Sequence, residues 1–255
     1  MIDIHSHLLF GVDDGPMDIE ESVELLKQAV SVGYTGIVCS SHYYIGRFEN
    51  INYHENFSIL KKRIKKERIP IEIYKGNEFA LDIEYKNHKE KINKINLGKY
   101  LLIELKTELI YPACKEFFSS LLNDGIVPVF AHIERYPHLK VKELIELHNM
   151  GVILQVNLRM AVNSIDRIEY LLKNRYIDII ATDTHRFGRR DYNIQENLEK
   201  LKEKLGEEYF NIVTNINPRK IINSENIGRG EKNEIEKING ISSFFTCIWS
   251  KLFRR

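Results

Sequence analysis

Apolar and polar residues alternate along the chain in two kinds of segment. Short apolar runs, rich in β-branched residues, predict buried strands at residues 2–7, 36–40, 71–76, 100–105, 126–131, 152–156 and 177–181. Amphipathic stretches between these runs predict helices at residues 18–30, 55–66, 112–122, 141–150, 166–173 and 192–205. Asp18, followed three residues later by Glu21, is a helix-capping pattern for the first helix. Strands that alternate with helices in this way favour an α/β fold with a parallel sheet.

Metal-capable side chains occur at the ends of six of the seven predicted strands. They are His5 and His7, His42, Glu78, Glu104, His132, and Asp183 with His185. In a parallel α/β fold the carboxyl ends of the strands share one face, so we expect these side chains to gather there. Residues i and i+2 of an extended strand point the same way, so His5 with His7, and Asp183 with His185, each direct two ligands into one mouth.

Each of these features has a simpler interpretation when it is taken alone. An H-x-H or D-x-H pattern is often incidental, His42 fits a helix cap, and Glu78 and Glu104 fit ordinary ion pairs. The joint arrangement favours a metal site, and the set is larger than one ion needs, which indicates two or three ions with a bridging carboxylate. The remaining histidines are interpreted as surface or packing residues: His54, His88, His138 and His148.

Composition narrows the class of protein. The 255 residues, 43% of them hydrophobic, suffice for one α/β barrel. The net charge of +1 gives no basic field, so no nucleic-acid partner is expected. Three cysteines without a C-x-x-C pair favour a reducing cytoplasm, and no secretory signal or membrane-spanning run is apparent. No arginine stands six residues after Cys39, Cys114 or Cys247, which disfavours a cysteine-dependent phosphatase.

The end of the chain has a different character. Residues 223–240 are polar and charged and are predicted to be a linker. Residues 241–255 (ISSFFTCIWSKLFRR) predict an amphipathic helix with a basic end. This pattern fits peripheral contact with the inner face of the membrane, and it fits equally a helix that docks on the barrel or on another subunit. The predicted division is therefore a domain at 1–222 and a tail at 223–255.

Several stretches resemble a known family. They are Ile2-Asp3-Ile4-His5-Ser6-His7, Val12-Asp13-Asp14-Gly15-Pro16, Ser40-Ser41-His42, Gly76-Asn77-Glu78, Ala131-His132-Ile133-Glu134-Arg135-Tyr136, Ala181-Thr182-Asp183-Thr184-His185 and Asn217-Pro218-Arg219-Lys220. Together they resemble the polymerase-and-histidinol-phosphatase (PHP) superfamily. More narrowly, the chain is similar to the bacterial tyrosine-protein phosphatases of capsule and exopolysaccharide loci, the CpsB/YwqE type.

The resemblance implies a distorted (β/α)7 TIM-like barrel, the PHP fold, with three metal ions that are usually manganese. It implies a first ion held by His5, His7, Glu78 and Asp183, a second held by the bridging Glu78 with Glu104 and His132, and a third held by Asp14, His42 and His185. It also implies that Arg135 holds the phosphate. The spacing leaves Arg189 or Arg190 as a second phosphate ligand, of which Arg190 is preferred, and Arg47 is a further candidate.

The implied activity is hydrolysis of phosphotyrosine on a membrane-associated tyrosine kinase that regulates capsule or exopolysaccharide synthesis. Asp14 and His42 are both candidates for the catalytic proton donor. One alternative is a PHP phosphatase that acts on a small phosphate ester such as histidinol phosphate. Another is a non-catalytic regulator that binds a kinase tail, although all nine expected ligand positions hold metal-capable side chains.

Overall fold

A computed structural model describes residues 1–106 and 109–228, and it is built around parallel strands. The strands are β1 (Ile2–Ser6), β2 (Gly36–Cys39), β3 (His42–Tyr43), β4 (Glu72–Lys75), β5 (Glu78–Ala80), β6 (Tyr100–Glu104), β7 (Val127–Phe130), β8 (Ile153–Asn157) and β9 (Ile179–Ala181). They pair in the order β1–β2–β4 and β3–β5–β6–β7–β8–β9, and every pair is parallel. All seven predicted strands are confirmed.

The barrel has seven positions because two of its strands are broken. β2 and β3 are successive halves of one strand, and so are β4 and β5, each pair separated by two residues. The barrel closes between β1 and the segment after β9. There the amide of Asp183 donates to the carbonyl of His5 at 2.9 Å, and the amide of His7 donates to the carbonyl of Thr184 at 2.7 Å. The broken strands account for the distortion of the (β/α)7 barrel.

Gly76 lies at the break between β4 and β5, where the chain passes very close to β2. A Cβ at this position would stand 2.5 Å from the side chain of Val38, so only glycine fits. The Tyr53 hydroxyl accepts from the Gly76 amide at 3.0 Å and donates to the Cys39 carbonyl at 2.7 Å. Tyr53 thus ties the two breaks together, and the residues that follow them, His42 and Glu78, are directed toward the same end of the barrel.

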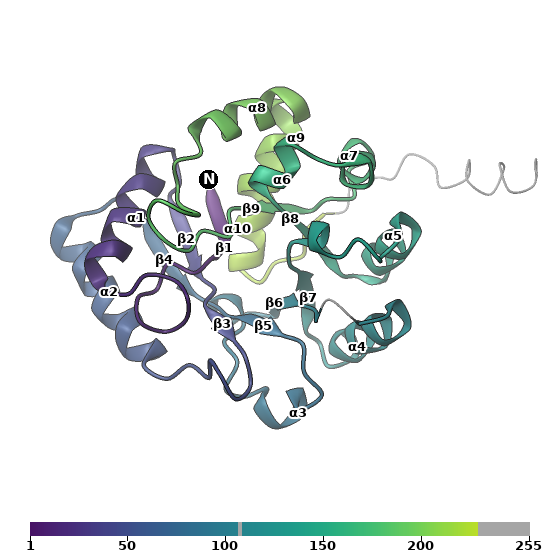
Figure 1. Cartoon of the computed structure of the whole chain (residues 1–255), viewed down its shortest axis with the longest axis horizontal. Coiled ribbons are helices and arrows are strands. Elements are labelled where there is room, and N and C mark those ends of the chain that lie inside the picture. Colours follow the sequence, from purple (N-terminus) through teal and green to yellow (C-terminus); the bar gives the residue numbers. More distant parts are fainter. Residues whose placement is uncertain (107–108, 229–255) are drawn as a thin grey trace, which may run out of the picture.

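Helices surround the strands (Figure 1). They are α1 (Ile19–Ser31), α2 (Tyr53–Glu67), α3 (Tyr85–His88), α4 (Tyr111–Asn123), α5 (Val141–Met150), α6 (Leu158–Val162), α7 (Asp166–Lys173), α8 (Gln195–Leu205), α9 (Glu207–Asn211) and α10 (Asn217–Ile222), with short turns η1 (Ile95–Leu97), η2 (Ile133–Arg135) and the π-helical η3 (Ile212–Ile216). The predicted Asp18 cap is confirmed, since its side chain accepts from the Glu21 amide at 2.9 Å.

One predicted helix begins later than expected. α8 starts at Gln195 rather than near Tyr192. The carboxylate of Asp191 accepts from the amides of Gly188 and Asn193, which holds a turn at this point, and Tyr192 is buried with its hydroxyl on Asp3. The four short helices α3, α6, α9 and α10 were not predicted because such segments are too short for a 3.6-residue repeat.

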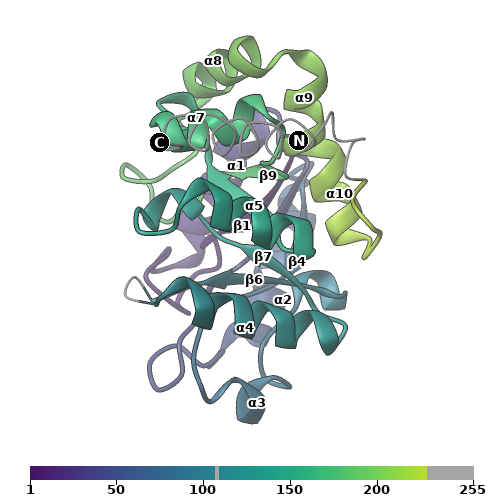
Figure 2. The same cartoon turned by 90° about the vertical axis from the view of Figure 1, so that its right-hand side faces the viewer.

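The interior of the barrel is a small apolar cluster closed at one end by α10. The inward side chains are Ile2, Ile4, Val38, Ile95, Tyr100, Leu102, Val129, Ala131, Ile153, Ile179, Ala181, Ile221 and Ile222. Ile221 and Ile222 come from α10, which lies at the same end of the molecule as the N-terminus (Figure 2). The opposite end of the barrel, where the strands finish, is left to polar residues.

The predicted linker begins against the barrel. The Tyr100 hydroxyl donates to the carbonyl of Glu225 at 2.6 Å, and Lys99 contacts Asn226 at 2.5 Å. The boundary at residue 222 stays a prediction. The predicted tail helix, residues 241–255, lies outside the described residues, as does Cys247. Within the described ranges, no helix is both long enough and apolar enough to cross a membrane.

We expect Ile221→Ala to destabilise the protein by about 2–5 kcal/mol, because it leaves a cavity at the closed end of the barrel. Urea unfolding would measure this change. Ile83→Ala is the matched control, since Ile83 is 94% exposed and its loss should have little effect. Equal stability of the two variants would mean that α10 is not part of the core.

Candidate metal centre

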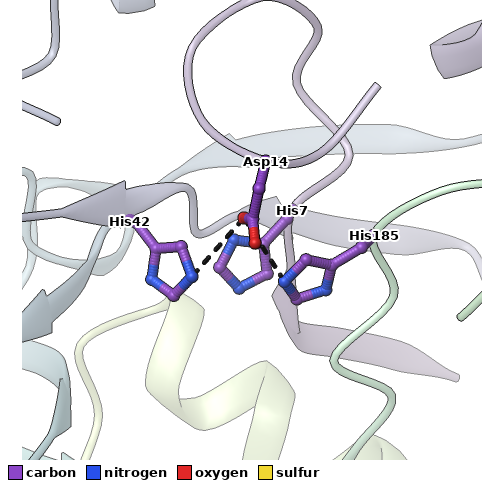
Figure 3. Close-up of side chains that lie close together, drawn as sticks. All are labelled: His7, Asp14, His42 and His185. Carbon is purple, nitrogen blue, oxygen red and sulfur yellow. Dashed lines mark ion pairs between the residues drawn. The ribbon is translucent and has the colours of Figure 1, made fainter. Parts of the chain in front are cut away.

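The structure brings all nine predicted metal-capable side chains together at the carboxyl ends of the strands. They form four overlapping groups, within each of which the ligand atoms lie within 4.8 Å of one another: His7, Asp14, His42 and His185; His5, Glu78 and His132; His5, His7 and Asp183; and His42, Glu78 and Glu104. Figure 3 shows the first group, with the Asp14 carboxylate directed toward His42 and His185. Asp14 is the exposed member, with 54% of its side chain accessible.

An extra residue in β1 places His5 in this cluster. Between the Asp3–Ile37 and Ser6–Cys39 pairs, β1 advances three residues while β2 advances two. Simple alternation would put Ile4 and His5 on opposite faces, but this bulge lets Ile4 join the barrel interior and His5 face the metal-capable groups. The Nε2 atoms of His5 and His7 are 3.4 Å apart, as the H-x-H spacing predicts.

Asp3 holds β1 against the segment that follows β9. Its buried carboxylate accepts from the His5 amide at 3.1 Å, from the amide and hydroxyl of Thr182, and from the Tyr192 hydroxyl at 2.9 Å. Burial raises the pKa of Asp3, although these hydrogen bonds act in the opposite direction. Asp3 therefore fixes the positions of both His5 and Asp183 without facing the cluster.

Two of the nine residues adopt the left-handed backbone conformation. Asp183 has φ of 56° and His132 has φ of 32°, values that are uncommon for residues other than glycine. Asp183 and His185 follow β9 rather than lying on it, so the expected strand alternation does not explain how they converge. The turn at Asp183 brings them together instead, with Nδ1 of His185 2.9 Å from the Asp183 carbonyl. Strain of this kind is concentrated at functional sites.

Glu78 is the central carboxylate of the cluster. Its oxygens lie 2.6 Å from Nε2 of His132, 3.1 Å from Nε2 of His7 and 3.3 Å from Nε2 of His5. Burial alone would favour its neutral form, but His5 and His132 outweigh that effect and hold the pKa of Glu78 well below its usual range. The buried carboxylate is therefore charged and depends on neighbouring positive charge.

The imidazoles differ in charge. Burial opposes protonation of His7, yet the carboxylates of Asp13 and Glu78 raise its pKa well above the usual value. Burial, followed by the charge on His7, lowers the pKa of His185 to about 2, so His185 is neutral and free to ligate. A metal ion requires neutral imidazole, so binding at His7 releases a proton.

The donor set fits metal ions. In the part of the chain that the structure describes, Nδ1 of His42 lies 3.1 Å from Glu78 but makes no hydrogen bond, because the two atoms are poorly aligned for one. The Nε2 atoms of His5 and His7 are 3.4 Å apart and lie 3.4 Å and 3.6 Å from Oδ1 of Asp183. Imidazole nitrogens and carboxylate oxygens that converge in this way are arranged as they would be around a shared cation.

Three polar residues around the cluster were given no role from the sequence. Asp13 contacts Nδ1 of His7 at 2.8 Å and accepts from the His42 amide at 2.8 Å. Gln155 contacts Nδ1 of His5 at 3.1 Å, and Asn157 donates to Asp183 at 3.0 Å. These residues orient the ligands. Asp13 precedes Asp14, and Gln155 and Asn157 end a predicted strand. Their places in the sequence, beside a predicted ligand or at a strand end, were the one signal that could have indicated their role.

Two arginines contact the same carboxylate oxygen of Asp183. Arg135 donates to it from η2, and Arg190 donates at 2.8 Å from the loop after β9. The alternative candidate, Arg189, is exposed. A cavity of about 300 Å³ lies beside these arginines, and its other walls include Glu134, Leu158, Met160 and Ile194.

Arg167 supports the segment that carries Arg135. Its guanidinium donates to the carbonyls of Tyr136, Leu139, Ile133 and Glu134. Arg167 was given no role from the sequence, because nothing in an amphipathic helix distinguishes an arginine that binds a distant loop from one that faces solvent.

The other candidates lie elsewhere. His54, His88, His138 and His148 contact Lys75, Tyr43, the Leu109 carbonyl and Asp178, respectively. Cys39 and Cys114 are buried, and burial raises the pKa of the Cys114 thiol to about 11. A thiol of that kind is a poor nucleophile, in keeping with the missing C-x5-R pattern.

A distorted parallel barrel with a buried His, Asp and Glu cluster at its carboxyl end defines the class: the fold matches the PHP and amidohydrolase-like barrels, and the clustered side chains are placed to hold more than one metal ion. A histidinol phosphate phosphatase from Lactococcus lactis subsp. lactis Il1403, solved with zinc, L-histidinol and phosphate, shares this fold. Its TM-score is 0.50 at 16% identity, over 80% of this chain and 93% of that chain.

The chain belongs to the CpsB/CapC family of capsular polysaccharide synthesis, whose model matches residues 1–223. This confirms the family expected from the sequence. The chain is 34% identical to the tyrosine-protein phosphatase CpsB of Streptococcus pneumoniae over 238 residues, covering 87% of this chain and 98% of that protein. It is 28% identical to the tyrosine-protein phosphatase YwqE of Bacillus subtilis (strain 168) over 219 residues, covering 82% and 86%.

The fold agrees with this assignment. A solved structure from the pair YwqE of Bacillus subtilis and CpsB of Streptococcus pneumoniae, described as unique metal-dependent tyrosine phosphatases, superposes with a TM-score of 0.81 at 27% identity. The superposition covers 92% of this chain and 100% of that chain. The distorted barrel expected from the sequence is thereby confirmed.

We expect Asp13→Asn to weaken metal binding by about 10- to 100-fold, because His7 loses the carboxylate that orients its ring. Calorimetric titration of the metal-free protein with Mn²⁺ would measure the affinity. Asp18→Asn is the control, since asparagine caps a helix as well as aspartate does. The same affinity in Asp13→Asn and Asp18→Asn would show that Asp13 does not support a metal ligand.

Proposed function

We propose that this chain is a manganese-dependent protein-tyrosine phosphatase that holds three ions in the nine-residue cluster. The observation that carries the proposal is the convergence of all nine expected ligands in four overlapping groups. The activity named for its CpsB and YwqE relatives supports the substrate class. The proposed substrate is a tyrosine kinase of the capsule or exopolysaccharide system.

The mixture of donors supports manganese. Five imidazoles and four carboxylates suit an ion that accepts both nitrogen and oxygen ligands, and sulfur is absent from the cluster among the described residues. The observed groups overlap the expected division into three ions without reproducing it. Glu78 belongs to two groups, one with His5 and His132 and one with His42 and Glu104, whereas His5, His7 and Asp183 form a group without it. One group adds His7 to Asp14, His42 and His185, so His7 is placed to serve a second ion as well.

Bound divalent ions neutralise the charge of a phosphate ester and supply an activated water as nucleophile at neutral pH. The residues of the chain supply the remainder. Glu78 and Asp183 would anchor the ions as carboxylates, because the imidazoles around them hold their pKa values low despite burial. Asp14 is the most exposed of the set and, with the neighbouring His42, faces the entering substrate as a candidate proton donor.

Arg135 and Arg190 are the proposed phosphate ligands. Both guanidiniums lie at the edge of the cluster with 43% of each side chain exposed, and both now contact Asp183. A guanidinium binds two phosphoryl oxygens at once and stabilises the charge that develops in the transition state. Tyrosine is a favourable leaving group because the phenol pKa is only about 10.

Treatment with EDTA should abolish hydrolysis of a phosphotyrosine peptide, and added Mn²⁺ should restore it, because the ions hold both nucleophile and substrate. Metal analysis of the restored protein should give about three ions per chain. Histidinol phosphate is the comparison substrate. Its preferential hydrolysis would replace the tyrosine assignment with the small-ester alternative, and activity indifferent to EDTA would remove the metal mechanism.

Arg135→Ala and Arg190→Ala should each lower kcat by about 100- to 1,000-fold while metal content is unchanged, because each removes a donor to the phosphoryl group. Arg189→Ala is the matched control from the same loop and should have little effect. Steady-state kinetics with the phosphotyrosine peptide, together with metal analysis, would test this. A larger loss in Arg189→Ala than in Arg190→Ala would reverse the assignment.

A further inference from the structure

A tight hairpin at residues 44–48 follows β3 at the edge of the metal cluster. The amides of Tyr44 and Phe48 each donate to the other residue's carbonyl at 2.8 Å. Gly46 turns the chain with φ of 80°, and no atom approaches within 4 Å of its missing Cβ. The tip of the hairpin therefore faces open space, while Tyr44 and Phe48 are held beside each other.

The two aromatic rings of the hairpin stand against the cluster. The Tyr44 ring centroid lies 4.6 Å from that of His42, and its hydroxyl donates to Glu104. The Phe48 ring lies 6.1 Å from His42, inclined by 14°, and 5.8 Å from Tyr44. Arg47 lies 4.8 Å above the Phe48 ring. The hairpin thus presents a half-buried aromatic wall beside two of the groups that face the ions.

We propose that Tyr44 and Phe48 contact the aryl ring of the substrate and select phosphotyrosine over phosphoserine and phosphothreonine. A phosphoryl group at the ions leaves one ester oxygen between phosphorus and the aryl carbon, so the ring must lie directly beside the metal ligands. Tyr44 occupies that position next to His42 and Glu104. Aromatic rings favour offset or edge-to-face contact with a second ring, which an alkyl ester cannot provide.

The 300 Å³ cavity is another apolar surface near the site, and its position makes it a weaker candidate for the aryl ring. Arg135 and Arg190 line this cavity and also contact Asp183, so they stand between it and the ions. When these arginines hold the phosphoryl oxygens, they fill the space between the cavity and the phosphorus.

Tyr44 has two separable contacts. Tyr44→Phe keeps the ring and removes the hydrogen bond to Glu104, whereas Tyr44→Ala removes both. A role in aryl recognition affects ligands with a ring and spares those without one. A role limited to positioning Glu104 affects both kinds of ligand equally and appears fully in Tyr44→Phe.

The test compares inhibition of the Mn²⁺-loaded protein by phenylphosphonate and by methylphosphonate, which share the phosphonyl group and differ in the ring. Tyr44→Ala should raise the inhibition constant of phenylphosphonate about fivefold relative to that of methylphosphonate. Tyr44→Phe should preserve the wild-type ratio. Met160→Ala, on the wall of the cavity, is the matched control and should also preserve it.

Two results would overturn the inference. Equal inhibition ratios in Tyr44→Ala and wild type would show that Tyr44 does not contact the ring, and a ratio that rises in Met160→Ala instead would place the ring in the cavity. The inference rests on the proposed function, and different results would overturn each of them. Wild-type protein that hydrolyses no phosphotyrosine peptide overturns both, whereas normal hydrolysis with an unchanged ratio in Tyr44→Ala overturns the inference alone.

Discussion

The burial of charged Glu78 is the constraint on which the rest of the site depends. Its carboxylate is 1% exposed and surrounded by imidazoles, with His132 at 2.6 Å and His7 at 3.1 Å. A buried charge is costly unless opposite charge and hydrogen bonds compensate it. The neighbouring carboxylates, Glu78 among them, raise the pKa values of His5 and His7, which favours positive charge beside Glu78, and divalent ions would compensate its charge more fully. The side chains around Glu78 therefore strongly favour binding of cations at the carboxyl end of the barrel.

Several irregular features of the backbone hold the metal-capable side chains in place. The bulge in β1 brings His5 inward, Gly76 lets the broken strand turn toward Glu78, and the left-handed conformation of Asp183 directs its side chain back into the cluster. Each departs from regular geometry, and each is held by a buried partner such as Asp3 or Tyr53. Irregular backbone at the site is offset by the regular apolar interior at the other end, which α10 closes.

Much of this could be predicted from the sequence because strand runs and their terminal residues are local signals. All seven strands, and the side chains His5, His7, His42, Glu78 and His132 at their ends, follow from periodicity and from the shared face of parallel strands. The breaks at residues 40–41 and 76–77, the turn at Asp183 and the carbonyl contacts of Arg167 were not predicted. These features depend on contacts between residues far apart in the chain, which the local periodicity of apolar residues does not reveal. Arg190 was preferred over Arg189 from the sequence, and the folded loop adds that the Arg190 guanidinium contacts Asp183.

We propose that the nine-residue cluster is itself a multinuclear metal centre. Anomalous X-ray scattering from crystals grown with Mn²⁺ and phosphate tests this most directly, because it locates each ion independently of activity. We expect three anomalous peaks among the four ligand groups, with Glu78 shared between two ions and phosphate on the side of Arg135 and Arg190. A cluster that stays empty of manganese in those crystals, or a single peak away from Glu78, would contradict it.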